Sequence, residues 1–347
     1  MRGLRKYLTP FAPDQSGAVS VLFEMGGIVV ICDAGGCTGN VCGFDEPRWF
    51  EQKSAIFSAG LRDMDAILGR DDRLVAKLAD VVQKIDATFV AVIGTPVPAV
   101  IATDYLALKR MSEKKIKLPI LTVDTDGMEL YDKGEEKAFL ELFKIFAIEK
   151  YQAEEDRIGI LGMTPQDVSD LKAADKMREL FQQKYDQQAV CYGMGDGLEE
   201  IKKASSASKN IVVSPAALVA AQYLEKTFGT PYEISYPLAG ELIPEMDYTG
   251  KKILVVHQQV IADSIRRELK ARGAEIVQVA DWFMMKKEFR EEGDVFLRDE
   301  DDYIEVVENG DFDIIFADEC MKRMVPEFGG IFVNTRHFAV SGKLIGK

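Results

Sequence analysis

The stretch GIVVICDAGGCTGNVCG, residues 27–43, joins a continuous apolar run to a glycine-rich loop that contains cysteines. A short run of β-branched residues is typical of a strand that is buried on both faces of a parallel sheet. Glycines directly after such a strand allow the backbone to approach a bound group closely. Open α/β sheets bind their ligands at the carboxyl ends of the strands. The stretch therefore predicts a buried strand that leads into a ligand-binding loop.

Apolar runs alternate with amphipathic stretches along the whole chain of 347 residues. We predict strands at Val19–Cys32, Phe89–Ile93, Ile120–Val123, Ile158–Leu161, Gln188–Cys191, Ile211–Val213, Ile253–His257, Glu275–Val279, Phe312–Ala317 and Ile331–Asn334. Helical patterns lie at Asp71–Ile85, Gly134–Tyr151, Pro165–Lys184, Gly197–Ala204, Pro215–Phe228 and Gln259–Arg272. Continuous apolar strands separated by helices of about 10–15 residues favour parallel sheets covered on both faces. The sequence therefore predicts an α/β protein.

The strand–helix pattern restarts twice, with RIGILG at residues 157–162 and GKKILVV at residues 250–256. Each restart is typical of a new Rossmann-like module. We therefore predict three modules with mainly parallel sheets, at residues 1–150, 151–245 and 246–347. The strand ends of three such modules can frame one common cavity.

The composition excludes several classes of partner. With 43 basic and 57 acidic residues the net charge is -14, the wrong sign for a general binder of nucleic acid or anionic membranes. No apolar run reaches the roughly 18 residues of a transmembrane helix. The first residues also lack the apolar core of a signal peptide. We therefore expect a cytoplasmic protein with neither nucleic acid nor membrane as partner.

Three of the five cysteines, Cys32, Cys37 and Cys42, lie within or beside the glycine-rich loop. In a cytosolic chain such a cluster suggests metal or redox chemistry more than disulfides. Thiolates bind iron–sulfur clusters. Cys37 and Cys42 lie in the loop itself and are the preferred ligands. Cys32 ends the apolar strand, where a buried cysteine behaves as a small hydrophobe, so its inclusion as a third ligand is an alternative.

The loop glycines at Gly35, Gly36 and Gly39 leave room for the inorganic core of such a cluster. A helix that starts near Thr38 would add free N–H groups that favour an anion. Competing interpretations fit less well. The chain has no Walker A motif, and its two histidines leave little for a mixed zinc site. The Cys42–Arg48 spacing matches a cysteine phosphatase, but the intervening carboxylates and proline oppose phosphate binding.

Several segments together resemble one known family. They are DAGGC at 33–37, SAGLRDMDAILG at 58–69, GTPVPAVIATD at 94–104, the strands at 119–126, 157–164 and 250–256, and NTRHFAVSG at 334–342. In this order they resemble the nitrogenase component 1-type oxidoreductases. That family includes the nitrogenase catalytic subunits, their cofactor scaffolds, the dark-operative protochlorophyllide reductase and the nickel-sirohydrochlorin reductive cyclase. The similarity runs from about Pro10 to Lys347 and implies the same fold.

The departures from the family pattern concern its cluster ligands. Members with a large subunit-bridging cluster use three cysteines per chain. Here only Cys37 falls on one of these places, and the other two hold Phe11 and Pro96. Ala99 replaces the usual glutamate. We therefore do not expect an eight-iron cluster or dinitrogen reduction, and we interpret Cys42 as this chain's own substitute ligand.

Two cysteines per chain make half of the ligand set of a [4Fe–4S] cluster. A two-fold homodimer that brings together Cys37, Cys42 and their symmetry mates would complete the four thiolates. This hypothesis predicts about two irons per chain. If Cys32 also binds, three ligands and an open position within one subunit become an alternative.

The resemblance implies an iron–sulfur oxidoreductase component. It would receive low-potential electrons from a separate ATP-dependent iron–sulfur reductase and reduce a small molecule between the modules, with a tetrapyrrole as one candidate. Two alternatives stay open. One is a scaffold that carries a metal cluster or a tetrapyrrole precursor without turnover, and the other is a binding protein without a cluster.

Three further residues are candidates for the wall of the central cavity. His257 ends a predicted strand, Asp33 follows one, and His337 lies in the segment where nitrogenase members of the family place a metallocofactor ligand. For the histidines a hydrogen-bonded structural role is the alternative. We interpret Cys191 and Cys320 as structural thiols.

Overall fold

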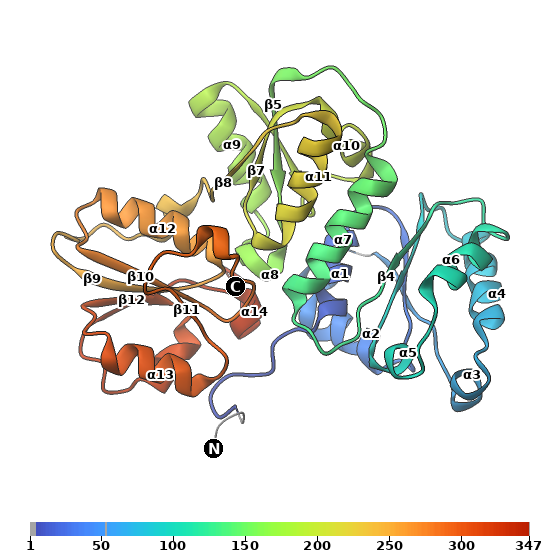
Figure 1. The fold of residues 1–347 in the computed structure, drawn as a ribbon, viewed down its shortest axis with the longest axis horizontal. Coiled ribbons are helices and arrows are strands. Elements are labelled where there is room, and N and C mark those ends of the chain that lie inside the picture. The colour runs from blue at the N-terminus through green and yellow to red at the C-terminus, as the bar shows by residue number, and fades with distance from the viewer. Residues whose placement is uncertain (1–4, 53, 347) are drawn as a thin grey trace.

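The computed structural model describes residues 5–52 and 54–346, in which the strands form three sheets with parallel pairing throughout (Figure 1). The strands are β1 (Ile28–Ile31), β2 (Ala55–Ser58), β3 (Val90–Ile93), β4 (Ile120–Val123), β5 (Glu154–Leu161), β6 (Gln188–Tyr192), β7 (Ala207–Val212), β8 (Tyr232–Ile234), β9 (Lys252–Val256), β10 (Ile276–Asp281), β11 (Val295–Phe296), β12 (Ile314–Ala317) and β13 (Ile331–Asn334). The helices are α1 (Asp14–Leu22), α2 (Gly36–Asn40), α3 (Asp63–Leu68), α4 (Asp71–Val82), α5 (Pro96–Val100), α6 (Tyr105–Glu113), α7 (Tyr131–Phe146), α8 (Pro165–Val168), α9 (Ala173–Tyr185), α10 (Leu198–Lys202), α11 (Leu218–Phe228), α12 (Gln259–Ala271), α13 (Glu300–Asn309) and α14 (Phe338–Ser341). The predicted α/β class is confirmed.

Each sheet is built from one continuous part of the chain. The strand orders are β2-β1-β3-β4, β6-β5-β7-β8 and β11-β10-β9-β12-β13. In each sheet the first strand in sequence, β1, β5 or β9, lies in the interior of the sheet. It carries a run of buried apolar residues, as β1 does with Ile28–Ile31. Parallel strands of this kind must be covered on both faces, and helices supply the cover.

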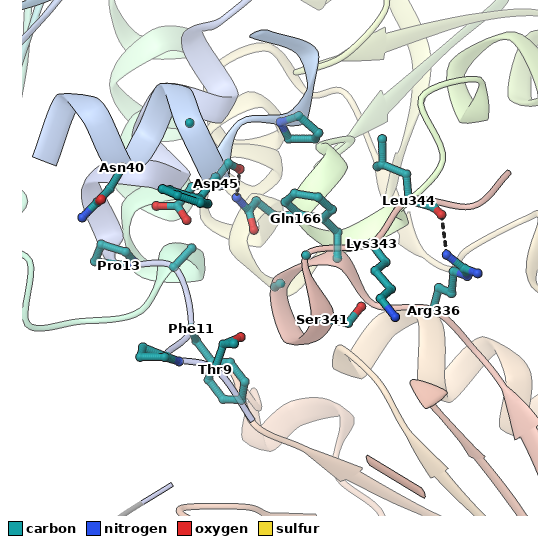
Figure 2. Close-up of a pocket in the computed structure, with 18 of the residues that line it drawn as sticks. Thr9, Phe11, Pro13, Asn40, Asp45, Gln166, Arg336, Ser341, Lys343 and Leu344 are labelled. Atoms are coloured by element: carbon teal, nitrogen blue, oxygen red, sulfur yellow. Dashed lines mark hydrogen bonds between the residues drawn. The ribbon is translucent and has the colours of Figure 1, made fainter. Parts of the chain in front are cut away.

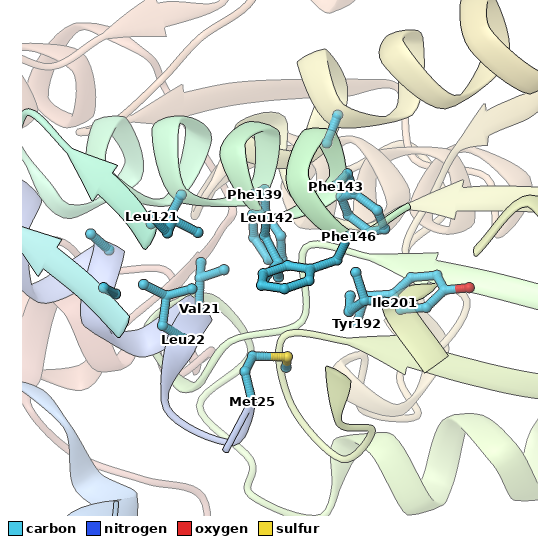
Figure 3. Close-up of a cluster of buried hydrophobic side chains, with 14 of the residues drawn as sticks. Val21, Leu22, Met25, Leu121, Phe139, Leu142, Phe143, Phe146, Tyr192 and Ile201 are labelled. Atoms are coloured by element: carbon cyan, nitrogen blue, oxygen red, sulfur yellow. The ribbon is translucent and has the colours of Figure 1, made fainter. Parts of the chain in front are cut away.

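Two helices connect the first sheet to the second. α1 and α7 cross closely, because Gly17 faces the backbone of Tyr131 and Gly134 faces the backbone of Asp14, where a Cβ atom would collide. The aromatic side chains of α7 then extend the core of the first sheet into the second, where Phe143 packs edge-on against Tyr192 of β6 (Figure 3). The first two sheets therefore share one apolar core.

The predicted strand at Val19–Cys32 is wrong over its first half. Residues 14–22 form helix α1, and only Ile28–Ile31 is a strand. Every residue of α1 is buried, so its apolar residues show no helical periodicity. An apolar run that is buried on all sides cannot be assigned to helix or strand from its pattern.

The sequence also misses the edge strands β2, β8 and β11, which are short and partly exposed. The helix predicted at Pro165–Lys184 is divided into α8 and α9. Ser169 lies between them with a φ of 57°, a left-handed conformation that ends α8.

Candidate functional site

The two loop cysteines lie on one irregular helix at the carboxyl end of β1. α2 continues into a π-helical turn, Val41–Asp45, which the N–H of Glu46 closes on the carbonyl of Val41 at 2.9 Å. Cys37 and Cys42 are both half-buried, and both pack against the apolar core shared by the first two sheets. Such π turns are rare and are frequent at functional sites. The structure therefore brings these two thiols to one side of the sheet.

Cys32 lies on the opposite side. Residues of a strand alternate between its two faces, and Val29 and Ile31 of β1 belong to the core that Cys37 and Cys42 contact. Cys32 belongs instead to the other core of the first sheet and is 2% exposed. Burial raises the pKa of its thiol to about 12. We leave Cys32 out of the ligand set that we propose below.

Asp33 holds the start of the cysteine helix. Its carboxylate accepts hydrogen bonds from the backbone N–H of Thr38 at 2.8 Å, from the Thr38 hydroxyl at 3.0 Å and from the Ser58 hydroxyl at 2.6 Å. The anion that the N–H groups of α2 favour is therefore this side chain. Asp33 is buried at the cysteine loop and does not line the large cavity described below.

Burial raises the pKa of both half-buried thiols. The neighbouring charge of Asp33 raises the pKa of Cys37 further, and that of Glu46 does the same for Cys42. A thiol must lose its proton to bind a metal. Metal binding at this loop would therefore release protons. The positive charge of the metal would offset the repulsion between each thiolate and its neighbouring carboxylate.

The glycines of the loop face open space. A Cβ atom added at Gly35, Gly36, Gly39 or Gly43 would meet no atom within 4 Å. Gly35 has a φ of 122°, which excludes other residues, but the other three do not need glycine for their backbone conformation or their packing. Glycine in a helix is destabilising relative to alanine, and nothing in the packing of this chain requires it at Gly36 or Gly39.

Arg48 fixes the segment that follows Cys42. Its buried guanidinium donates to both carboxylate oxygens of Glu46 at 2.8 Å and to Glu24 at 2.8 Å. It also donates to the carbonyls of Ser20 at 2.6 Å and Gly193 at 3.1 Å. This one side chain therefore ties the end of the cysteine loop to α1 and to the second module.

A cavity of about 940 Å³ opens beside the cysteine loop (Figure 2). Three parts of the chain form its wall: residues 9–13, residues 40–50 around Cys42, and residues 336–344 near the C-terminus, together with Gln166 of α8. The amide of Gln166 is buried, and its nitrogen donates to the carbonyl of Asp45 at 2.5 Å. Its oxygen has no hydrogen-bond partner among the residues that the structure describes. The volume lies in the range of small-molecule sites.

The lining of the cavity combines cations with aromatic rings. Arg336 and the exposed Lys343 lie on one side, and Phe11, Phe44 and Phe338 contribute apolar surface. Guanidinium and ammonium groups bind carboxylates, and aromatic rings stack on flat ligands. The arrangement suits a planar molecule with acidic substituents.

The two histidines lie behind this cavity, where the three modules meet. Their rings stack with centroids 4.2 Å apart. Nδ1 of His257 accepts the N–H of Gln258 at 2.9 Å, so Nε2 carries the proton and donates to the carbonyl of Arg336 at 3.1 Å. Nε2 of His337 lies 3.2 Å from the Tyr131 hydroxyl. Neither histidine lines the cavity, although the neighbours Arg336 and Phe338 do.

The two histidines of the junction behind the cavity are held neutral. Burial lowers the pKa of His257 to about 4, and burial together with His257 lowers the pKa of His337 well below its usual range. The Tyr131 hydroxyl donates to Asp167 at 2.5 Å, and burial raises the pKa of that carboxyl to about 6. Burial also raises the pKa of Glu135 well above its usual value.

This neutral pair predicts a loss of stability in acid. Unfolded His257 takes up a proton near pH 6.5, whereas the folded ring does so only near pH 4, so its stabilisation is complete above pH 6.5 and is lost as the pH falls toward 4. The free energy of unfolding of the protein, relative to that of His257→Gln, should therefore fall by about 2 kcal/mol between pH 7 and pH 4.5. Urea unfolding of both proteins across this range measures the difference. A constant difference would contradict the prediction.

Comparison with known proteins identifies the family. The sequence model described as "Nitrogenase component 1 type Oxidoreductase" matches residues 14–241, more than half of the chain. The chain belongs to this family. Two solved nitrogenase structures share the fold of this chain. Nitrogenase Cp1 at pH 6.5 superposes with a TM-score of 0.73 at 12% identity, covering 96% of this chain and 87% of that one. Nitrogenase Cp1 at pH 5 gives 0.69 at 14% identity, covering 99% and 87%.

A search of curated proteins finds no match. No helix among the described residues is long and apolar enough to cross a membrane. No group of three or more histidine, cysteine or acidic side chains in the described part of the chain is arranged to hold a metal ion.

Sequence reasoning considered Arg48 only for a phosphatase site and missed its structural role, and it missed Gln166 altogether. The available signal for Arg48 was a glutamate and an arginine two residues apart, close to the candidate ligand Cys42. Gln166 carries no signal, because only the contact between α8 and the cysteine loop gives it a role.

Proposed function

We propose that this chain is an iron–sulfur oxidoreductase component that reduces a small molecule in the cavity beside its cysteine loop. Cys37 and Cys42 would supply half of the ligands of a [4Fe–4S] cluster shared by two copies of the chain. The observation that carries the proposal is the placement of these two half-buried thiols on one helix whose glycines face open space. The bound cluster would supply one-electron chemistry at low potential.

The residues present fit such a group. Two thiols are available on the correct side of β1, Asp33 and Arg48 hold the two ends of the segment that carries them, and the open backbone leaves room outside the chain. Thiolates from a second copy would complete the set, as the usual four-cysteine ligation requires.

Exposed apolar side chains around the loop support a second copy as the partner. They follow the carboxyl ends of all four strands of the first sheet and are Phe44, Met64, Ile67, Leu68, Val97, Val100, Ile101 and Met128. Because parallel strands end at the same edge of a sheet, these side chains surround the cysteine helix. Exposed apolar side chains that gather on one part of the surface often mark protein interfaces.

The cavity would hold the substrate. Its wall includes Asn40 and Gly43, which flank Cys42, so a bound molecule would lie next to the cluster loop. Arg336 and Lys343 would bind acidic substituents, and a tetrapyrrole with carboxylate side chains is one candidate. The chain has no Walker A motif, so the electrons would come from a separate ATP-dependent iron–sulfur reductase.

Iron analysis of anaerobically purified protein tests the proposal. We expect about two irons per chain, a red-brown absorption spectrum and a dimer in sedimentation. Reduction by an iron-protein reductase that depends on ATP would distinguish the oxidoreductase from a cluster scaffold. An iron-free, colourless monomer would contradict the proposal.

Gly36→Ala tests the open space directly. Gly36 is the first residue of α2 and has ordinary helical geometry, so alanine should leave the free energy of unfolding unchanged or raise it by up to about 1 kcal/mol. The added methyl group would occupy the open side beside Cys37 and should lower the iron content at least about twofold. Gly329→Ala, also in open space but in the third module, is the matched control. Full iron content in Gly36→Ala would show that iron does not bind on this side.

A further inference from the structure

One wall of the cavity is formed by a segment of the first module that lies on the third module. Residues 5–13 leave the start of α1 and run across the third module toward α13 (Figure 1). Thr9–Pro13 form the cavity wall opposite Arg336 and Lys343 (Figure 2). We call residues 5–13 the strap. Its N-terminal end is attached to the third module, and its C-terminal end leads into α1 of the first module.

One carboxylate of the third module accepts three backbone hydrogen bonds from the strap. Glu300, the first residue of α13, accepts the backbone N–H of Lys6 at 2.7 Å, of Tyr7 at 2.9 Å and of Leu8 at 2.8 Å. A segment that is paired in a sheet distributes its backbone bonds over many partners, whereas here three consecutive N–H groups end on one side chain. Hydrogen bonds to an ionised acceptor are also stronger than those between neutral groups. These bonds outweigh burial and lower the pKa of Glu300.

Two further contacts complete the attachment. The Phe11 ring packs with its centroid 5.0 Å from that of Phe283 and 5.7 Å from that of Trp282, and the Arg5 guanidinium lies 3.6 Å from the Phe11 ring centroid. The Arg323 guanidinium donates to the carbonyl of Tyr7. Phe11 thus both anchors the strap and lines the cavity, at a position where relatives with a large cluster have a cysteine.

We propose that the strap completes the ligand cavity and that Glu300 is the positioning residue that keeps it closed. The proposal rests on the assignment of the cavity as the substrate site. With the strap docked, the ligand meets the Phe11 ring and the backbone of Thr9–Pro13. When the strap is released, this wall is lost and the cavity opens toward solvent, so affinity falls. Glu300 touches no ligand and acts through the strap alone.

The test combines hydrogen exchange with binding of protoporphyrin IX, a flat dicarboxylate, in the full chain. In Glu300→Ala we expect amide exchange in residues 5–13 to become at least about tenfold faster, and the dissociation constant of the porphyrin to rise by a similar factor. Quenching of tryptophan fluorescence reports the binding. Glu308→Ala, an exposed glutamate on the same helix, should change neither quantity.

Arg323→Ala provides an independent release of the strap, because this exposed residue holds Tyr7 from a different element. It should change exchange and affinity in the same direction by a smaller factor. Unchanged exchange in both variants, or faster exchange with unchanged affinity, would overturn the proposal. A wild-type chain that does not bind the porphyrin would overturn the roles of cavity and strap together. Iron content is measured separately and tests only the cluster proposed at Cys37 and Cys42. A negative result there is therefore distinguishable from a negative result for the strap.

Discussion

Replacing Cys37 with alanine is expected to reduce the iron content from about two irons per chain to near zero, with loss of the visible absorption. Both copies of the chain in the dimer carry the substitution, so it removes two of the four thiolate ligands. Cys42→Ala should have the same effect. Anaerobic reconstitution followed by iron analysis and absorption spectroscopy measures both variants.

The remaining cysteines provide matched controls. Cys32 lies in the opposite core of the first sheet, Cys191 is buried in the second module and Cys320 lies in the third. Alanine at any of these positions should leave the iron content unchanged. Stoichiometric iron in Cys37→Ala would contradict the shared cluster, and loss of iron in Cys32→Ala would bring that residue into the ligand set.

Replacing Arg48 with methionine is expected to lower the free energy of unfolding by about 3–5 kcal/mol. The substitution leaves Glu46, which is 1% exposed, as a buried carboxylate without its bidentate partner. It also removes the donor to the carbonyls of Ser20 and Gly193. Urea unfolding monitored by circular dichroism measures the loss.

Two variants isolate the cause of this loss. Arg70→Met removes an exposed ion pair with Asp72 and should leave the free energy of unfolding nearly unchanged. The double variant of Arg48→Met with Glu46→Gln removes the uncompensated charge and should recover part of the stability. A loss for Arg48→Met no larger than that for Arg70→Met would show that the buried network does not hold the cysteine segment.

The fold could be predicted from the sequence because its signals are local. The apolar strands β4 and β13 have the predicted bounds, and the restarts at residues 157 and 250 each begin a new sheet. The signal failed where burial removed periodicity, as in α1, and where edge strands such as β11 were too short to form a pattern. These failures changed boundaries but not the class of fold.

The candidate site was only partly accessible from the sequence. The pattern of residues 32–42 pointed to the cysteine loop, because cysteines and glycines after a strand are recognisable one after another along the chain. Asp33 was placed at the correct strand end, yet its carboxylate caps α2 and does not face the cavity. The histidines were expected in the wall of the central cavity. They lie behind this wall, and their rings stack on each other.

The sequence by itself determined the α/β class and the cysteine loop, since both depend on residues that are neighbours along the chain. Only the tertiary structure decided which cysteines share a side of β1, because the faces of a strand become distinct only when each packs against a different core. It also decided that Glu300 holds Lys6–Leu8, nearly three hundred residues away in sequence. Such contacts depend on how the three modules pack, and no local pattern of residues encodes them.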